Sequence, residues 1–185
     1  KGASVIKQLV KTIGYDSFKS GMQTYMGTHA FSNTTLSDWL NCLDAETPRD
    51  LKPWAASWLE TSQHNTVTAS IVENTDSATS ILVSQSAPDS HPLLREHALE
   101  LAIGYLDNDE VTIDTTDYFI SSHEHQISLD KTTPSFVFPN YDDHGFLKAG
   151  LDSATLDFMR HHLEKVNEPL LRMQIWQSLW EMVRD

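Results

Sequence analysis

The chain has 185 residues, of which 39% are hydrophobic and 21% charged, with only seven Gly and seven Pro. This composition is typical of a globular protein and excludes wholesale disorder, collagen and low-complexity repeats. No apolar run approaches the roughly 20 residues of a membrane helix, and the lone cysteine, Cys42, excludes an intrachain disulfide. We therefore expect no membrane partner and, with no secretory signal in the sequence, a cytoplasmic location.

The net charge of −13 is unevenly distributed along the chain. Residues 1–66 carry six basic and six acidic residues, whereas residues 67–152 carry three basic and fifteen acidic ones. All five Trp lie outside this acidic middle section. Nucleic-acid binding needs clustered Lys and Arg, so no nucleic-acid partner is expected. The two compositional shifts predict three parts, with boundaries near 66 and 152.

The first part predicts successive helices. An apolar stripe from Val5 to Ile13 predicts one helix, which Gly14 ends. Asp16 or Ser17 is expected to cap a second helix. The residues expected on one face of that helix are Phe18, Met22, Tyr25 and Met26.

Two more helices are expected before residue 66. Asn33–Thr35 supplies cap oxygens for the third helix, with Asp38 as the capping-box acid. Asp50 begins the fourth, where Pro53 is tolerated in the first turn. The residues expected inside these two helices are Leu36, Trp39, Leu40 and Leu43, then Leu51, Trp54, Ala55, Trp58 and Leu59.

The middle part changes to the two-residue period of β-strands. Leu99, Leu101, Ile103 and Tyr105 alternate with small or polar residues, which predicts a half-buried strand. About seven short strands separated by turn residues predict an antiparallel sandwich. The other β-prone runs are Val67–Val72, Ser80–Ser84, Val111–Ile113, Tyr118–Ile120, Gln126–Leu129, Ser135–Phe138 and Phe146–Leu151. The turns are expected at Asn74–Asp76, Pro88–Ser90, Asp107–Asp109 and Asn140–Gly145.

The last part returns to helix. Ser153 is expected to cap a segment with apolar residues at helical spacing, and Asn167–Pro169 starts a final helix. Apolar residues between Leu170 and Val183 cover far more than the single stripe of a surface helix, so this helix expects neighbours on several sides. The predicted fold class is α+β, with an N-terminal helical bundle, a central antiparallel β-sandwich and a C-terminal helical pair.

Nine histidines raise the question of a metal site. The His-Glu-x-x-His motif, which places two imidazoles on one helical face beside a glutamate that activates water, is absent from the sequence. The nearest pattern is His123-Glu124-His125, which offers two ligands and no third at short spacing. Structural or solvated histidines are therefore favoured, and an adventitious metal pair at His123 and His125 stays an alternative.

Other polar groups give no clear active site. His161 and His162 lie on a predicted helix, with His161 facing Lys165, and a solvated face explains them. The oxygen-rich loop Asn140–Gly145 suggests calcium, but the twelve-residue calcium-loop spacing is missing and Asx turns explain it equally well. Cys42 is expected to be a small buried hydrophobe. The sequence contains no Gly-x-Ser-x-Gly, P-loop or dinucleotide fingerprint.

Five segments in order along the chain carry a family resemblance. They are Lys1-Gly2-Ala3-Ser4-Val5; Phe18-x-x-Gly21-Met22-x-x-Tyr25 with His29–Thr35 and Asp38; Trp54-Ala55-x-x-Trp58-Leu59-Glu60-Thr61 with Asn65-Thr66; Pro139-Asn140-x-Asp142-Asp143-x-Gly145-Phe146-x-Lys148; and Trp180–Asp185. Together they resemble the aminopeptidase N family of zinc metallopeptidases. The resemblance spans essentially the whole chain and is clearest at its two ends.

This resemblance implies the helical end of a catalytic domain at 1–66, a β-sandwich domain at 67–152 and the start of an all-helical domain at 153–185. The parent enzyme would use zinc-activated water to remove N-terminal residues from peptide substrates. The family's zinc ligands, its Gly-x-Met-Glu-Asn segment and its oxyanion-stabilising tyrosine all precede the Lys-Gly-Ala element. No catalytic, substrate-binding or metal residue therefore maps onto this chain, which is expected to be an inactive scaffold fragment.

Two alternatives from other classes stay open. In the first alternative, the sandwich is an independent module that binds a protein or carbohydrate through exposed aromatic residues. The aromatic residues considered for that face are Tyr118, Phe119, Phe136 and Phe138. In the other, His123 and His125 serve a metal-storing or metal-sensing protein. Separately, the apolar face of residues 170–183 predicts self-association of the isolated chain.

Overall fold

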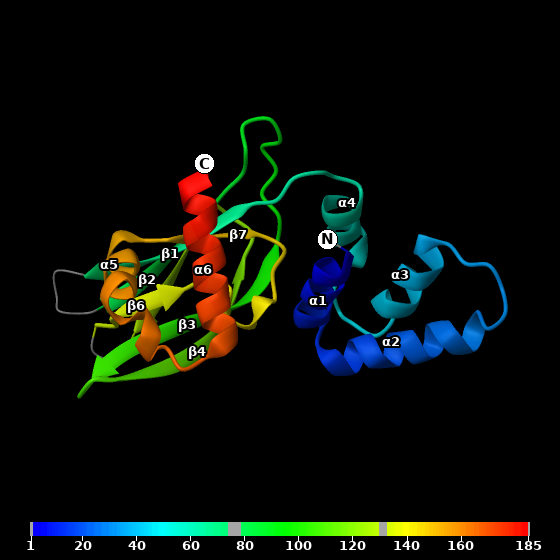
Figure 1. The fold of residues 1–185 in the computed structure, drawn as a ribbon. Coiled ribbons are helices and arrows are strands. Elements are labelled where there is room, and N and C mark those ends of the chain that lie inside the picture. The colour runs from blue at the N-terminus through cyan, green and yellow to red at the C-terminus, as the bar shows by residue number, and fades with distance from the viewer. Residues whose placement is uncertain (1, 74–78, 130–132, 185) are drawn as a thin grey trace. The chain divides into compact units, whose positions relative to one another are not determined.

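The computed structural model describes residues 2–73, 79–129 and 133–184. The chain divides into two compact units, the helical Lys1–Ser62 and Gln63–Asp185, which contains two β-sheets and the C-terminal helices (Figure 1). The predicted α+β class, with helices before and after an antiparallel-rich sandwich, is confirmed. Among the described residues, no helix combines the length and the apolarity needed to cross a membrane.

The first unit consists of four helices, α1 (Gly2–Ile13), α2 (Tyr15–Thr28), α3 (Leu36–Asp44) and α4 (Leu51–Leu59). Gly14 separates α1 from α2 with a φ of 85°, a left-handed conformation that glycine adopts without strain. Leu36 and Leu59, which were expected inside, are 46% and 38% exposed. The buried side chains are Val5, Gln8, Leu9, Leu43, Leu51, Trp54, Ala55 and Trp58.

Side-chain caps explain where two of these helices, α3 and α4, begin. Thr35 and Asp38 form the predicted capping box, and the hydrogen bonds from Thr35 lower the pKa of the Asp38 carboxyl. Asp50 caps α4, also as predicted. The prediction for α2 is wrong: its N-cap is Gly14, with no side-chain hydrogen bond, and Asp16 lies in the first turn, where its charge complements the helix dipole.

Seven strands among the described residues build the sandwich of the second unit. One sheet has the order β5-β2-β1-β7 and the other the order β4-β3-β6. All neighbouring strands are antiparallel except β1 and β7, which are parallel. The strands are β1 (Thr66–Glu73), β2 (Thr79–Ser86), β3 (His97–Asp107), β4 (Glu110–Ile120), β5 (Glu124–Leu129), β6 (Phe136–Phe138) and β7 (Lys148–Leu151).

The strand predictions are mostly confirmed, with one merger. The separate runs predicted at 111–113 and 118–120 belong to the single strand β4, because β4 pairs with β3 along its whole length. The predicted turn between these strands is also present. Asn108 and Asp109 have φ values of 46° and 72°, the left-handed pair that fits a tight hairpin. The turn predicted at Asn74–Asp76 lies outside the described residues.

Two hydrophobic cores share strand β6. The first lies between the sheets and includes Val67, Ile81, Leu99 and Val137. The second lies between the sheets and the C-terminal helices, and its largest fully buried side chains include Phe136 and Phe138. The strands are therefore covered on both faces near β6, and the unit has three layers rather than two.

Because of this second core, β3 is buried on both faces over part of its length. His97–Leu101 alternates between buried and half-buried residues, as predicted, but Ala102 and Gly104 are buried although they were placed on the outer side. The reason is that Gly104 lies opposite Phe136 of β6, whose ring occupies the space where a side chain would project.

The C-terminal helices are α5 (Ser153–His162) and α6 (Pro169–Arg184), joined by the 3-10 turn η2 (Leu163–Lys165), and they lie against the sandwich (Figure 1). The predicted start of α6 at Pro169 is confirmed. The predicted cap of α5 is off by one residue: Asp152, not Ser153, is the N-cap and accepts a hydrogen bond from Thr155 N at 2.8 Å. Asp152 also accepts from Ile71 N, which ties the start of α5 to β1.

The contact between β3 and β6 gives a first testable prediction. A Cβ added at Gly104 would lie 1.9 Å from Cε1 of the fully buried Phe136 ring, so Gly104→Ala overpacks the second core. We expect a loss of about 3 kcal/mol in the free energy of unfolding, measured by urea denaturation of the whole chain. The control is Gly27→Ala in α2, where nothing lies within 4 Å and little change is expected. Equal stability of the two variants would contradict this packing.

Candidate functional site

Helix α6 presents apolar side chains on two opposite faces. At 100° per residue, Leu171 and Ile175 lie on one side, and both are fully buried against the sandwich. Trp176 and Trp180 lie on the other side and are 63% and 68% exposed. The expectation that apolar residues exceed one stripe is confirmed. Apolar patches of this kind mark interaction surfaces. The outer face of α6 is defined as Met173, Trp176, Trp180 and Val183.

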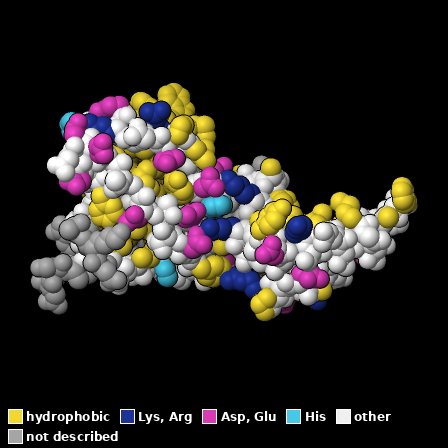
Figure 2. Space-filling view, turned by 90° about the horizontal axis from the view of Figure 1, so that it is seen from below, with side chains coloured by type: hydrophobic (Ala, Val, Ile, Leu, Met, Phe, Trp, Pro, Cys, Tyr) yellow, Lys and Arg dark blue, Asp and Glu magenta, His cyan; other side chains and the backbone are white. Residues whose placement is uncertain are grey.

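An open groove of about 670 Å³ runs beside this outer face, between α5 and α6. Apolar side chains make up most of its wall, which also includes charged residues of α5 and η2. Hydrophobic side chains also reach the surface among acidic ones on the side of the molecule drawn in Figure 2. The residues of the groove are Ser153, Leu156, Asp157, Met159, Arg160, Leu163, Glu164, Trp176 and Leu179.

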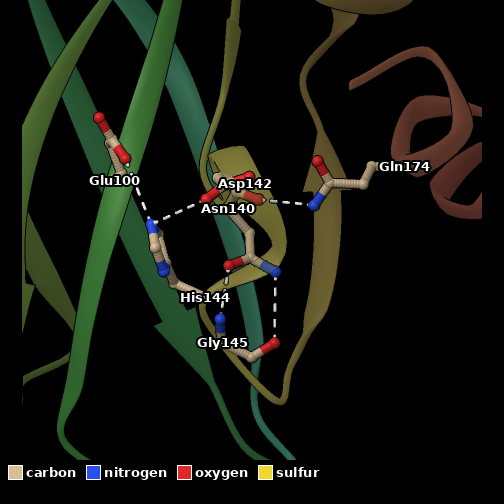
Figure 3. A network of polar contacts seen from close by, with 6 residues as sticks. All are labelled: Glu100, Asn140, Asp142, His144, Gly145 and Gln174. Carbon is tan, nitrogen blue, oxygen red and sulfur yellow. Dashed lines mark hydrogen bonds and ion pairs between the residues drawn. The ribbon is translucent and has the colours of Figure 1, made fainter. Parts of the chain in front are cut away.

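The loop between β6 and β7 is closed by the side chain of Asn140, which is buried. Its Oδ1 accepts a hydrogen bond from Gly145 N at 2.8 Å, and its Nδ2 donates to Gly145 O at 3.3 Å (Figure 3). The main-chain oxygen of Asn140 accepts from Nε2 of Gln174 on α6 at 2.7 Å. One residue therefore fixes the loop and attaches it to the last helix.

A second set of contacts joins the loop to β3. Nε2 of His144 lies 3.3 Å from Oε2 of Glu100 and 3.7 Å from Oδ2 of Asp142 (Figure 3). Burial, followed by nearby carboxylates, raises the pKa of the Tyr141 hydroxyl. Sequence reasoning missed the contribution of Glu100, because it is 44 residues from His144 in a strand whose pattern marks it only as an outward-facing position.

The loop geometry accounts for its oxygen-rich sequence without a metal. The side-chain oxygen of Asn140 already accepts an N–H, and the Asp142 carboxylate faces an imidazole. Asp142 and Asp143 both have left-handed backbone conformations, with φ values of 58° and 55°, which Asp tolerates better than most residues. The Asx-type structural interpretation is the one that these contacts favour.

Among the described residues, the histidine pair considered for metal binding has no third ligand. His125 lies in β5, and its ring stacks at 6.3 Å with that of Tyr118. His123 precedes the strand, is exposed, and its main-chain oxygen accepts from Gln85 N. Within the described ranges, no three side chains of His, Cys, Asp or Glu are grouped so that they could hold a metal ion.

The histidines of α5 have different surroundings. His161 is on the solvated face, as predicted, and its Nδ1 lies 2.9 Å from the main-chain oxygen of Asp157. Lys165, which was expected to face His161, instead forms an ion pair with Asp109 in the β3–β4 turn. His162 packs against the ring of Phe158 at 5.0 Å, so the solvated interpretation is wrong for this residue.

Two further expectations concern the cysteine and the aromatic residues. Cys42 is only partly buried, so the expectation of a buried cysteine is wrong. Tyr118, Phe136 and Phe138 are all less than 8% exposed, and the Tyr118 hydroxyl donates to Pro139 O at 2.6 Å. Burial raises the pKa of this hydroxyl well above its usual value. These three residues therefore do not form the exposed aromatic face that a binding sandwich requires.

The comparisons with known proteins agree on one class, the aminopeptidases. The chain is 35% identical to aminopeptidase N of Streptomyces lividans over 199 aligned positions, which cover all of this chain and 23% of that protein. It is 24% identical to glutamyl aminopeptidase of Rattus norvegicus, over 88% of this chain and 17% of the relative. No protein-family model matches the chain.

A solved structure supports the fold. Aminopeptidase A of Legionella pneumophila, solved in complex with aspartic acid, matches 72% of this chain and 16% of its own length, with a TM-score of 0.55 and 14% identity. The resemblance to the aminopeptidase N family is therefore confirmed, and the chain corresponds to a segment of such a protein. It spans less than a quarter of the length of these relatives.

The closed loop gives a second prediction. Asn140→Ala leaves the buried N–H and C=O of Gly145 without their partner, so we expect the free energy of unfolding to fall by about 2–3 kcal/mol. Asn140→Asp keeps the acceptor and loses the donor, and its effect should be smaller. Asp143→Asn, at an exposed position of the same loop and compatible with its left-handed backbone, is the matched control. Urea denaturation measures all three, and an unchanged Asn140→Ala would contradict the structural role.

The outer face of α6 gives a third prediction. Because Trp176 and Trp180 expose large apolar surfaces, the isolated chain should self-associate at micromolar concentration in analytical ultracentrifugation. The double variant Trp176→Glu/Trp180→Glu should shift the distribution toward monomer, whereas Gln177→Glu, at an exposed polar position of the same helix, should not. A purely monomeric wild-type chain would show the prediction to be wrong.

Proposed function

We propose that this chain is a non-catalytic part of a zinc-dependent aminopeptidase whose whole protein hydrolyses N-terminal residues from peptides. The observation that carries the proposal is the 35% identity to aminopeptidase N over the full chain. The role of the chain would be that of a scaffold, with buried strands and helices that position other parts of the enzyme. Its substrates would be peptides with a free N-terminus, bound elsewhere in the protein.

The described residues do not fit a catalytic zinc. Such a site needs three protein ligands with an open position for water, and no group of three donor side chains forms among residues 2–73, 79–129 and 133–184. The candidate histidines are engaged in ring contacts or lie apart from further donors. We therefore derive no catalytic step for this chain, and the zinc of the proposed enzyme is assigned to residues outside it.

The proposed roles of the segments follow the three parts predicted from composition. Residues 1–66 would be the helical end of a catalytic domain, residues 67–152 a sandwich spacer, and residues 153–185 the start of an all-helical domain. The outer face of α6 supports this proposal, since Trp176 and Trp180 need a cover that the second unit does not supply. In the whole enzyme, the partners of this face would be the remaining helical segments.

An independent binding sandwich finds no support in the described residues. Of the four aromatic side chains considered for it, those at positions 118, 136 and 138 are buried in the two cores, and Phe119 is partly buried. A metal-storing function would depend on His123 and His125, for which no third ligand is in place among the described donors. The scaffold proposal requires neither feature.

The fourth prediction tests the scaffold role directly. The purified chain, incubated with zinc and an aminoacyl reporter substrate, should release no reporter above the rate of the buffer, since its described donors form no group of three. A full-length relative such as the Streptomyces aminopeptidase N is the positive control for the assay. Saturable hydrolysis by the chain, abolished by a chelator, would overturn the proposal.

A further inference from the structure

A group of polar residues closes one end of the core between the sheets. Along β1, β2 and β3 the inward-facing residues are apolar until this end, where the same faces carry Asn65, Gln85, Arg95 and His97. Each of the four is at most 3% exposed. This set, the polar end cluster, lies where the chain enters β1, and none of its members belongs to the loop or the helix face described above.

Asn65 connects the segments that meet in the polar end cluster. Its Nδ2 donates to Leu93 O at 2.7 Å, and its Oδ1 accepts from Arg95 N at 3.2 Å. Its main-chain oxygen accepts from Lys148 N at the start of β7 at 2.9 Å. The segment before β1 is thus attached, through a single residue, to the segment that leads into β3 and to the start of β7. These contacts also fix the orientation of the Asn65 amide, because its nitrogen must face a carbonyl and its oxygen an N–H.

The fixed amide determines the state of His97. Nε2 of His97 lies 3.3 Å from Oδ1 of Asn65, which can only accept, so Nε2 must carry the proton and donate. A neutral imidazole with its proton on Nε2 satisfies this contact. A second proton would have to go onto Nδ1, inside a site with no exposed surface. The packing therefore favours the neutral ring over the charged one.

The charge near His97 also favours the neutral imidazole. Arg95, two residues earlier on the same inward face, is the charged group whose field acts on the imidazole. Burial, followed by the charge of Arg95, lowers the pKa of His97 to about 3. The other titratable residues of the surrounding segments are His64, Glu96, His123 and Glu124, which are exposed, and Lys148 on β7.

We propose that the polar end cluster is an acid-sensitive latch, in which the neutral His97 ring holds Asn65 and acidification releases the segment that precedes β1. Protonation of His97 requires that the ring leave the cluster and reach water. When the ring leaves, Asn65 Oδ1 loses the hydrogen bond that His97 Nε2 donates to it. The hydrogen bonds that Asn65 makes with the segment before β3 and with β7 are then weakened. The strands nearer the middle of the sandwich keep their apolar contacts and open later.

The sign of the pH effect follows from linkage. The imidazole has a pKa near 6.5 in the unfolded chain and about 3 in the folded one, so the unfolded chain binds one more proton between these values. The contribution of His97 to stability is complete above pH 6.5 and is lost progressively as the pH falls toward 3. Over most of this range, the equilibrium constant for opening rises about tenfold per pH unit because of this one group.

The experiment combines nuclear magnetic resonance with hydrogen exchange on the whole 185-residue chain. In the wild type at pH 5.5, the ring nitrogens of His97 should report a neutral imidazole protonated on Nε2. Amide protection, corrected for intrinsic exchange, should fall at Arg95 and Lys148 as the pH decreases from 7 to 5. Protection in the middle of β1 and β2 should persist.

Variants isolate the role of the ring. His97→Gln retains a nitrogen donor for Asn65 and cannot be protonated, so its opening constant should rise about tenfold less than that of the wild type between pH 5.5 and 4.5. His91→Gln, at an exposed position, should follow the wild type. A His97 that titrates near 6.5 in the folded chain, or parallel pH profiles for wild type and His97→Gln, would overturn the latch. The wild-type spectra decide the question even if His97→Gln fails to fold.

Discussion

The second unit depends on the burial of three consecutive residues of β6, which face both cores. Val137 packs between the sheets, while Phe136 and Phe138 face the helices, and the Phe136 ring stacks on Phe158 of α5 at 5.1 Å. The outer edge of β6 is not left open: Oγ1 of Thr155 accepts from Val137 N and donates to Val137 O. The helix thus completes the sheet edge as well as the core, and a short strand suffices.

Local signals in the sequence predict local structure well. The capping box at Thr35 and the hairpin turn at Asn108 follow from residues within four positions of each other, and both are present. Contacts that join distant segments have no such signal. The pattern of β3 marks Gly104 as outward-facing, but it cannot reveal that Phe136 covers this face. For the same reason, the pairing of Glu100 with the β6–β7 loop was not predicted.

The cap of α5 shows how tertiary contacts choose between equivalent local options. Asp152 and Ser153 are adjacent, and both residue types are good N-caps. The carboxylate of Asp152 accepts from Thr155 N within the helix and from Ile71 N in β1, whereas a serine hydroxyl is a weaker partner for two donors. The helix therefore starts one residue earlier than the sequence alone suggests, because the cap also anchors a strand.

The same logic explains why the outer face of α6 stays exposed. Rotation of the helix by half a turn would bury Trp176 and Trp180, but it would expose Leu171 and Ile175 and break the hydrogen bond from Gln174 to Asn140. The loop that Asn140 closes thus fixes the rotation of α6, and the second unit cannot relieve the exposure by itself. The remaining way to remove this apolar surface from water is contact with further polypeptide, which is what a scaffold segment of a larger enzyme would provide.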